Sequence, residues 1–299
     1  MKEMDYTLEN DLLEVKVSAH GAELQSIKNK RNGFEYLWQG DPTFWKRRSP
    51  VLFPIVGALW NGEFRMDGKT YEMGQHGFAR DMDFMLVEDT PDDQLWFRLD
   101  STPETLERFP RQFRLEIGYQ LVETRLTVYW KVTNTGDVDM PYQIGAHPAF
   151  NLPDFNPADP VHGYFAFNHM DTELVSERIA EKGCVGTEMQ RPELTPLEWL
   201  LPIKADTFVN DALIFGGRKV NRVSLMDKAR QPWLTLLFDT PYVGLWSPKP
   251  DAPFVCIEPR YGRADSLGYS GEFADRTAVN KLLPHDSHTL FYHIIIDSL

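Results

Sequence analysis

Alternation of apolar and polar residues recurs along this chain and constrains its fold more than any other feature. Leu13, Val15 and Val17 alternate with polar residues, and the runs 113–121 and 126–132 keep the same period of two. This period is typical of strands with one buried face. The last two runs are joined by the short connection VETR, which predicts a hairpin and therefore an antiparallel sheet.

Helical patterns are few and short. Only TPETLERFP, LTPLEWLLP and AVNKLL look helical, and each is bounded by proline or a capping residue. The 20 glycines and 21 prolines are spread along the chain rather than gathered in a linker, and there is no repeat. We therefore predict one all-β domain over residues 1–299, an antiparallel β-sandwich with a few short helices.

Composition excludes several classes of partner. A net charge of -13 argues against nucleic acid and anionic membranes, which both attract basic proteins. No apolar run reaches the roughly 18 residues of a membrane span, and the N-terminal segment lacks the apolar stretch of a signal peptide, so we expect a cytoplasmic protein. Cys184 and Cys256 are expected to be buried thiols.

Four stretches combine titratable side chains with residues that break or end a strand. They are GQHGFARD (74–81), GAHPAFN (145–151), VNDALIF (209–215) and CIEPRYG (256–262). Among their side chains, His76 and His147 titrate near neutrality, Asp211 and Glu258 offer carboxylates, and Arg80 offers a guanidinium. The chain has no nucleophilic Ser or Cys motif, no glycine-rich phosphate loop and no CxxC metal spacing, so this set suits a reaction that only moves protons. Opening a sugar hemiacetal is one, because a base takes the proton of the anomeric hydroxyl while an acid protonates the ring oxygen.

Aromatic residues lie in or near the same stretches. Phe78, Trp246 and Tyr261 are the candidates, with Phe53 nearby. Because the C–H face of a pyranose packs on an aromatic ring, we expect them to contribute to a sugar site.

The motifs HGFAR, GAHPAFN and IEP, together with PVLFPIVGAL at 50–59 and GAELQSIK near the N-terminus, resemble the aldose 1-epimerase (galactose mutarotase-like) family, specifically its bacterial LacX-like branch. The similarity covers almost the whole chain. It implies a galactose mutarotase-like β-supersandwich and an isomerase that acts on a hexose without a cofactor.

The resemblance also implies roles for individual residues. His147 matches the family's general acid and Glu258 its general base, while His76 matches a second histidine that contacts the sugar near its ring oxygen. Asp211 matches a hydroxyl-binding aspartate, and Arg80 matches an arginine that we take as substrate-binding.

Two departures from the family pattern concern the substrate. The branch usually has a tryptophan where this chain has Arg260, followed by Tyr261, and a guanidinium there suits a charged sugar. The hexose-6-phosphate epimerase relatives carry a glycine pair before the proline-rich strand, where this chain has a basic cluster, Lys46, Arg47 and Arg48. A hexose 6-phosphate is therefore an alternative substrate.

Other functional classes stay open. A non-catalytic sugar-binding or sugar-sensing protein would use the same pocket. A glycosidase would need two carboxylates about 5 to 10 Å apart, such as Glu258 and Asp211, but histidine acids are not its usual pattern. His285, His288 and His293 lie over a loop and a strand, so we expect structural histidines there and no metal.

Overall fold

Most of the chain is antiparallel β-sheet, as the alternation predicts. The structure is a computed structural model and describes residues 5–168, 174–195 and 198–299. Two large sheets dominate the described part, and their strands pair in antiparallel fashion. Among the described residues, no helix is long and apolar enough to cross a membrane.

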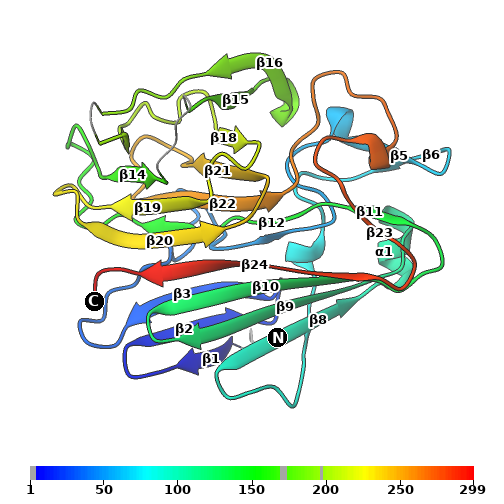
Figure 1. Ribbon diagram of the computed structural model, residues 1–299, viewed down its shortest axis with the longest axis horizontal. Coiled ribbons are helices and arrows are strands. Elements are labelled where there is room, and N and C mark those ends of the chain that lie inside the picture. The colour runs from blue at the N-terminus through cyan, green and yellow to red at the C-terminus, as the bar shows by residue number, and fades with distance from the viewer. Residues whose placement is uncertain (1–4, 169–173, 196–197) are drawn as a thin grey trace.

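The nine-stranded sheet contains, in spatial order, β17 (Leu200–Pro202), β14 (Tyr164–Phe167), β19 (Arg222–Met226), β20 (Pro232–Phe238), β24 (Ser287–Ile296), β10 (Arg125–Asn134), β9 (Phe113–Val122), β8 (Gln94–Asp100) and β7 (Met85–Leu86). Figure 1 shows the long strands β24, β10, β9 and β8 side by side. The predicted hairpin is confirmed, since β9 and β10 pair from Val122 opposite Arg125 outward.

The eight-stranded sheet contains β16 (Val185–Gln190), β15 (Ser176–Ile179), β18 (Leu213–Gly216), β21 (Tyr242–Trp246), β22 (Phe254–Tyr261), β12 (Ile144–Ala146) and β4 (Val51–Leu52), with β13 (Ala149–Asn151) also paired to β22. Its inward side chains, such as Val243 and Ile257, belong to the same buried cluster as Leu115 and Trp130 of the nine-stranded sheet. The core therefore lies between the two sheets, as in a sandwich.

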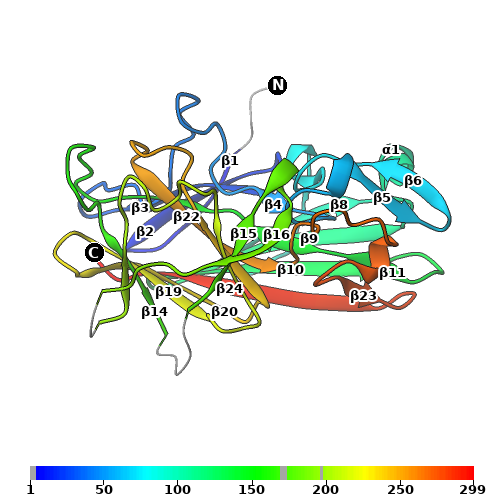
Figure 2. The same cartoon turned by 90° about the horizontal axis from the view of Figure 1, so that it is seen from above.

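Smaller elements cover the ends. They are β1 (Asp5–Glu9), β2 (Leu13–Ser18) and β3 (Glu23–Asn29) in one sheet, the pairs β5 (Glu63–Met66) with β6 (Lys69–Glu72) and β11 (Met140–Tyr142) with β23 (Asn280–Leu282), the helix α1 (Pro103–Arg108), and the 3-10 turns η1 (Trp60–Gly62), η2 (Ala79–Asp81), η3 (Glu181–Gly183) and η4 (Phe273–Asp275). The β5–β6 hairpin and α1 lie at the end of the molecule away from the C-terminus (Figures 1 and 2).

The helix predictions had mixed outcomes. TPETLERFP forms α1, where Thr102 caps the first turn. AVNKLL was expected to be helical but contains strand β23, because Leu282 pairs opposite Met140 and is buried. Residues 196 and 197 of LTPLEWLLP lie outside the described residues, and its end is strand β17.

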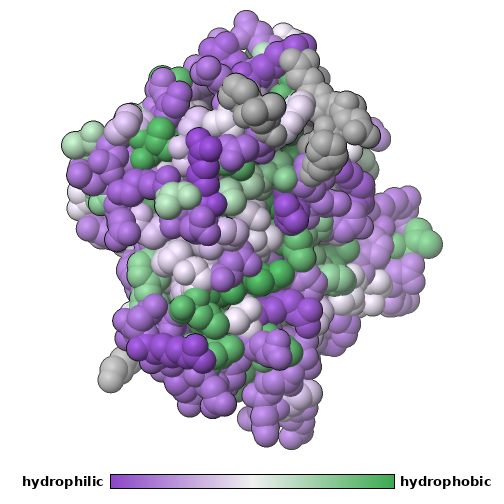
Figure 3. All heavy atoms as spheres, turned by 60° about the vertical axis from the view of Figure 1, so that its left-hand side comes forward, coloured by the Kyte–Doolittle hydropathy of each residue, from purple (hydrophilic) through white to green (hydrophobic). Residues whose placement is uncertain are grey.

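Core positions follow the alternation closely. All of the predicted apolar positions in the hairpin and in the 13–17 run are buried. Cys184 and Cys256 are both free and buried, as expected. On the face shown in Figure 3, most residues are hydrophilic, and many of the hydrophobic ones lie near the middle of that face.

Candidate active site

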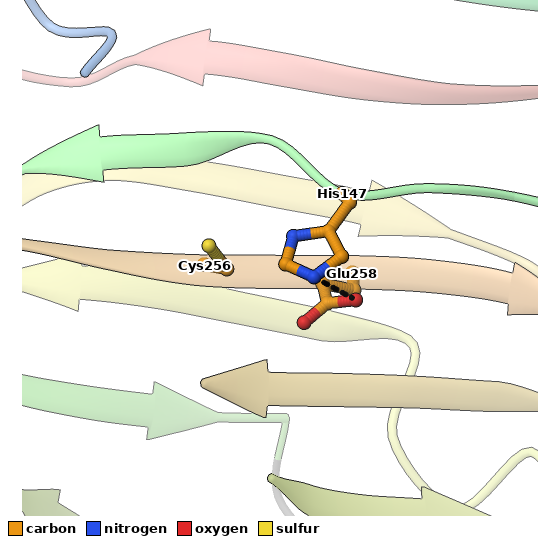
Figure 4. Close-up of side chains that lie close together, drawn as sticks. All are labelled: His147, Cys256 and Glu258. Atoms are coloured by element: carbon orange, nitrogen blue, oxygen red, sulfur yellow. Dashed lines mark ion pairs between the residues drawn. The ribbon is translucent and has the colours of Figure 1, made fainter. Parts of the chain in front are cut away.

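His147 and Glu258 form a direct cross-strand pair on the outward face of the eight-stranded sheet. The pairs Gly145–Arg260 and Ala149–Cys256 belong to one register between β12, β13 and β22, which places His147 opposite Glu258. His147 Nε2 lies 3.3 Å from Glu258 Oε2. Figure 4 shows the imidazole reaching from the β12–β13 junction toward the carboxylate on β22.

Two prolines, Pro148 and Pro259, lie next to this pair, and each removes one N–H donor from the hydrogen bonds between the strands. The Ile257 amide donates to the Pro148 carbonyl at 3.2 Å, so His147 and Glu258 occupy the intervening non-hydrogen-bonded position, where facing side chains are closest. Pro148 on one strand and Pro259 on the other have no N–H to donate. The sequence motifs HP and EP therefore mark the two halves of one paired site.

This placement corrects one expectation. We expected CIEPRYG to break or end a strand, but Glu258 and Pro259 lie inside β22. The strand continues because it is held on its other side by β21, where Gly244 lies opposite Glu258 and Val243 opposite Pro259. Glu258 is consequently fully buried.

Arg260 lies two residues after Glu258 and turns back to it. One of its terminal nitrogens, Nη2, donates to Glu258 Oε2. The Arg260 side chain is 8% exposed, so this is a buried ion pair. Within the part of the chain that the structure describes, Glu258 Oε1 has no hydrogen-bond partner.

His76 reaches the same place from the loop after β6. Its Nδ1 accepts the Gly57 amide at 3.0 Å, which leaves the proton of a neutral ring on Nε2. The His76 ring stands edge-on to the His147 ring, with centroids 5.6 Å apart. Gly77 fixes this turn, because it has a φ of 71° and a Cβ there would collide with the Phe53 carbonyl oxygen.

Burial determines the charge state of both imidazoles. Burial lowers the pKa of His147 to about 4, with Glu258 acting in the opposite direction and Arg260 in the same direction. The pKa of His76 lies well below its ordinary value, mainly because of burial, and the nearby His147 and Arg260 act in the same direction. Both rings are therefore neutral near pH 7.

The remaining polar groups come from two loops. Arg80, in η2, donates from Nη2 to the Gln75 carbonyl at 2.7 Å. Its buried Nε lies 3.8 Å from Asp81 Oδ2 and has no hydrogen-bond partner among the described residues. Burial and the neighbouring Arg47 lower the pKa of Arg80 to about 10, so it stays charged at neutral pH. Asp211 lies at the exposed rim in a left-handed conformation, with a φ of 71°.

Two tryptophans enclose the His147 ring. The Trp45 ring centroid lies 4.8 Å from it at an interplanar angle of 31°, and the Trp246 centroid lies 5.5 Å away and nearly perpendicular. Sequence reasoning identified Trp246 but missed Trp45, which precedes the basic cluster. The only available signal was an aromatic residue close to the PVLFPIVGAL motif.

These residues line one cavity of about 270 Å³, close to the lower end of the roughly 300–1,000 Å³ of small-molecule sites. The predicted residues that line it are His76, Arg80, His147, Asp211, Trp246, Glu258 and Arg260. Lining residues that sequence reasoning missed include Trp45, Gln75, Ile179 and Ile214.

Three of the aromatic residues considered for the site are placed elsewhere, and one of them, Phe53, is fully buried in the core. Phe78 is buried in the core, where its ring lies 6.2 Å from that of Phe113. Tyr261 is half-buried and donates its hydroxyl to the Asp239 carbonyl at 2.8 Å. Phe78 precedes the 3-10 turn that carries Arg80, so its position beside the site in sequence does not bring its ring into the cavity.

Unsatisfied polar atoms gather at this cavity. Within the described residues, seven buried side-chain nitrogen or oxygen atoms have no hydrogen-bond partner, and four of them belong to Arg80, His147, Glu258 and Arg260. Buried polar groups are rarely left unpaired, because desolvating each one costs about 1–3 kcal/mol. A ligand with several hydroxyl groups would supply both the donors and the acceptors that these atoms lack.

The contacts within this site do not favour a bound metal ion. His147, Cys256 and Glu258 offer ligand atoms within 4.8 Å of one another (Figure 4). Glu258 is already paired with Arg260, and burial raises the pKa of the Cys256 thiol well above its ordinary value, which disfavours the thiolate that binds metals.

The C-terminal histidines are bound to separate partners. His285 lies 3.3 Å from Asp137, His288 Nδ1 lies 2.9 Å from the Tyr142 hydroxyl, and His293 Nδ1 lies 3.0 Å from the Thr127 hydroxyl. His162 is buried beside Phe155, and His20 lies 2.7 Å from Asp83. His169 lies outside the described residues.

Comparison with known proteins places this geometry in a family. The sequence model of aldose 1-epimerase matches residues 4–259. The chain belongs to the aldose 1-epimerase family. Protein LacX (chromosomal) of Lactococcus lactis subsp. lactis is 32% identical over 98% of this chain and 99% of its own length.

Solved structures agree with the family assignment. A galactose mutarotase related enzyme from Lactobacillus acidophilus has a TM-score of 0.88 and 33% identity, covering 99% of this chain and 98% of its own. A galactose mutarotase-like protein from Lactobacillus casei has a TM-score of 0.91 and 30% identity, covering 98% of this chain and 100% of its own. The fold is therefore the galactose mutarotase-like sandwich that the motifs implied.

Proposed function

We propose that this member of the aldose 1-epimerase family interconverts the α- and β-anomers of a hexose, with His147 as the general acid and Glu258 as the general base. The observation that carries the proposal is the direct opposition of these two side chains, 3.3 Å apart, in a cavity rich in unpaired polar atoms. An acid and a base placed at one ring can open a hemiacetal without a cofactor.

The reaction would proceed through the open-chain sugar. Glu258 Oε1 takes the proton of the anomeric hydroxyl, the imidazolium of His147 gives its Nε2 proton to the ring oxygen, and the bond from C1 to that oxygen breaks. Rotation about the C1–C2 bond presents the other face of the aldehyde. Closure returns both protons, so the site regains its starting state.

Burial of His147 affects both the acid strength of its imidazolium and the fraction of the ring that is charged. A His147 pKa of about 4 makes its imidazolium a stronger acid than an exposed one, which suits protonation of a weakly basic ring oxygen. The same burial makes the charged form scarce near pH 7. We therefore expect kcat/KM to increase as the pH falls below neutrality, because the imidazolium of His147 becomes more abundant.

The other cavity residues would bind the sugar. His76 presents a protonated Nε2, Arg80 a guanidinium, and Asp211 a carboxylate at the rim, which together suit sugar hydroxyls. Trp45 and Trp246 would pack on the C–H face of the ring.

A phosphorylated hexose is the second candidate, favoured by the charge of Arg80 at the cavity. The basic cluster gives it less support than its sequence suggests. Arg47 pairs with Asp81 at 2.8 Å, and Arg48 donates to the Gln25 side chain, so both are engaged within the protein.

The test is anomer exchange followed by NMR on glucose, galactose and glucose 6-phosphate, with and without protein. Acceleration of a free sugar supports the proposal, and acceleration of the phosphosugar alone selects the second candidate. Saturable binding without acceleration would make the protein a sugar-binding module. Release of nitrophenol from a nitrophenyl glycoside would instead indicate a glycosidase.

Matched variants assign the roles. We expect His147→Asn and Glu258→Gln each to slow exchange by about 10²- to 10⁴-fold, the usual contribution of a positioned acid or base. His20→Asn and Glu188→Gln are suitable controls, because both side chains are exposed and bound to surface partners. Full exchange rates in His147→Asn would remove it from the mechanism.

A further inference from the structure

Arg260 and His147 converge on the same oxygen of Glu258. Arg260 Nη2 donates to Oε2, and His147 Nε2 lies 3.3 Å from that atom. The other oxygen, Oε1, has no hydrogen-bond partner in residues 5–168, 174–195 and 198–299. The carboxylate therefore has one restrained oxygen and one available oxygen.

The sheet leaves a gap that the Arg260 side chain fills. Gly244 of β21 lies opposite Glu258, on the side away from His147. A Cβ at Gly244 would lie 3.0 Å from Arg260 Cζ and 3.1 Å from Nη2. On the other flank, a Cβ at Gly145 would lie 3.3 Å from Arg260 Cγ. The guanidinium lies where a side chain on β21 would otherwise be.

Burial of the Arg260 guanidinium costs folding free energy, because it removes a charged group from water. Arg260 is buried, and no described residue forms a hydrogen bond with its Nε. A buried ion pair is weak evidence for added stability, since desolvation offsets much of its attraction. It does restrain geometry, because a guanidinium directs its donors along fixed lines.

We propose that Arg260 is a positioning residue for Glu258, which holds Oε2 so that Oε1 faces the anomeric hydroxyl. The proposal rests on the proposed function. Arg260 acts through the carboxylate rather than as an anchor for a charged sugar.

The charge of Arg260 has a second, separable effect. Burial is the main reason for the low pKa of His147, and the Arg260 charge lowers it further. Removing that charge raises the His147 pKa. The titratable and charged groups around His147 are Cys256, Glu258 and Arg260 on β22, His76 and Arg80 on the 74–81 segment, Arg47 beyond them, and Asp211 at the rim.

Three variants test the proposal on whichever sugar the wild type converts. Arg260→Met removes both the positive charge and the planar guanidinium, whereas Arg260→Lys keeps the positive charge alone. Gly244→Ala keeps the arginine but displaces its guanidinium. We expect kcat to fall on the order of 10- to 100-fold in Arg260→Met and Gly244→Ala, with KM within about threefold, because a small misplacement of a reacting group has this effect. Arg260→Lys should recover part of the loss.

The pKa of His147 provides a second readout, which would not change if Arg260 had only a structural role. NMR of the His147 ring should show a higher pKa in Arg260→Met than in the wild type, and the corresponding limb of the kcat/KM profile should move to higher pH. Arg218→Met is the matched control, because Arg218 is 52% exposed and pairs with Asp239 on the surface.

The outcomes are distinct. A wild type that converts no sugar removes the proposed function and this inference with it. An active wild type whose Arg260→Met variant keeps its kcat within twofold overturns the inference alone. A rise in KM with an unchanged kcat would also overturn it, by making Arg260 a substrate-binding residue. If Arg260→Met does not fold, Arg260→Lys and Gly244→Ala decide the question.

Discussion

The low pKa of His147 has a consequence for stability that does not depend on the reaction. In the folded protein the buried ring stays neutral down to a pKa of about 4, whereas in the unfolded chain it takes up a proton near its ordinary pKa of about 6.5. The unfolded state therefore binds more protons between these values. The free energy of unfolding must fall as the pH is lowered from about 6.5 toward 4.

The size of the effect follows from these two pKa values. Proton linkage gives a destabilisation of about 0.2 kcal/mol at pH 7 and about 2 kcal/mol at pH 5. His147 is 7% exposed, so solvent screening removes little of this. Replacing His147 by asparagine eliminates the linked term, whatever else the substitution changes in the protein.

The assay is urea unfolding of wild type and His147→Asn at pH 7 and pH 5, followed by tryptophan fluorescence. We expect the wild type to lose about 2 kcal/mol more than the variant between the two pH values, because all other groups titrate in both proteins. His20→Asn, at an exposed histidine bound to Asp83, should behave like the wild type. Equal losses in wild type and His147→Asn would refute the reasoning.

Three further predictions concern the fold and the cavity. Gly77→Ala should destabilise by about 1–3 kcal/mol or more in urea unfolding, because its Cβ collides with the Phe53 carbonyl, whereas Gly217→Ala, with a similar φ of 75° and open space around it, should cost less. Trp45→Ala should raise KM for the sugar by about tenfold through the loss of stacking, with the exposed Trp199→Ala as a control that leaves KM unchanged. Arg276→Met should lower the free energy of unfolding in urea by about 3–5 kcal/mol, because it leaves the buried Asp265 carboxylate without its ion-pair partner. Adding Asp265→Asn should recover part of this free energy; no recovery would mean that the lost packing dominates.

Local pattern was enough to predict the fold class, and it failed where tertiary pairing outweighed it. The alternation at 113–121 and 126–132 predicted strands, their hairpin and their buried faces, because the apolar–polar period is a local property of each segment. AVNKLL looked helical in isolation, yet pairing of Leu282 with Met140 makes it a strand. Pro259 suggested a strand end, yet β22 runs through it because β21 supports the strand from the other side.

The site divides in the same way. The sequence alone determined the types of groups available, His147 and Glu258 each before a proline, because short motifs carry that information. Only the tertiary structure decided that these residues face each other across one strand pair, that Trp45 joins them while Phe78 and Tyr261 do not, and that Arg260 fills the space over Gly244 to hold Glu258. The physical reason is register: 111 positions separate His147 from Glu258, and no local preference of either segment fixes which residues of two distant strands lie opposite each other.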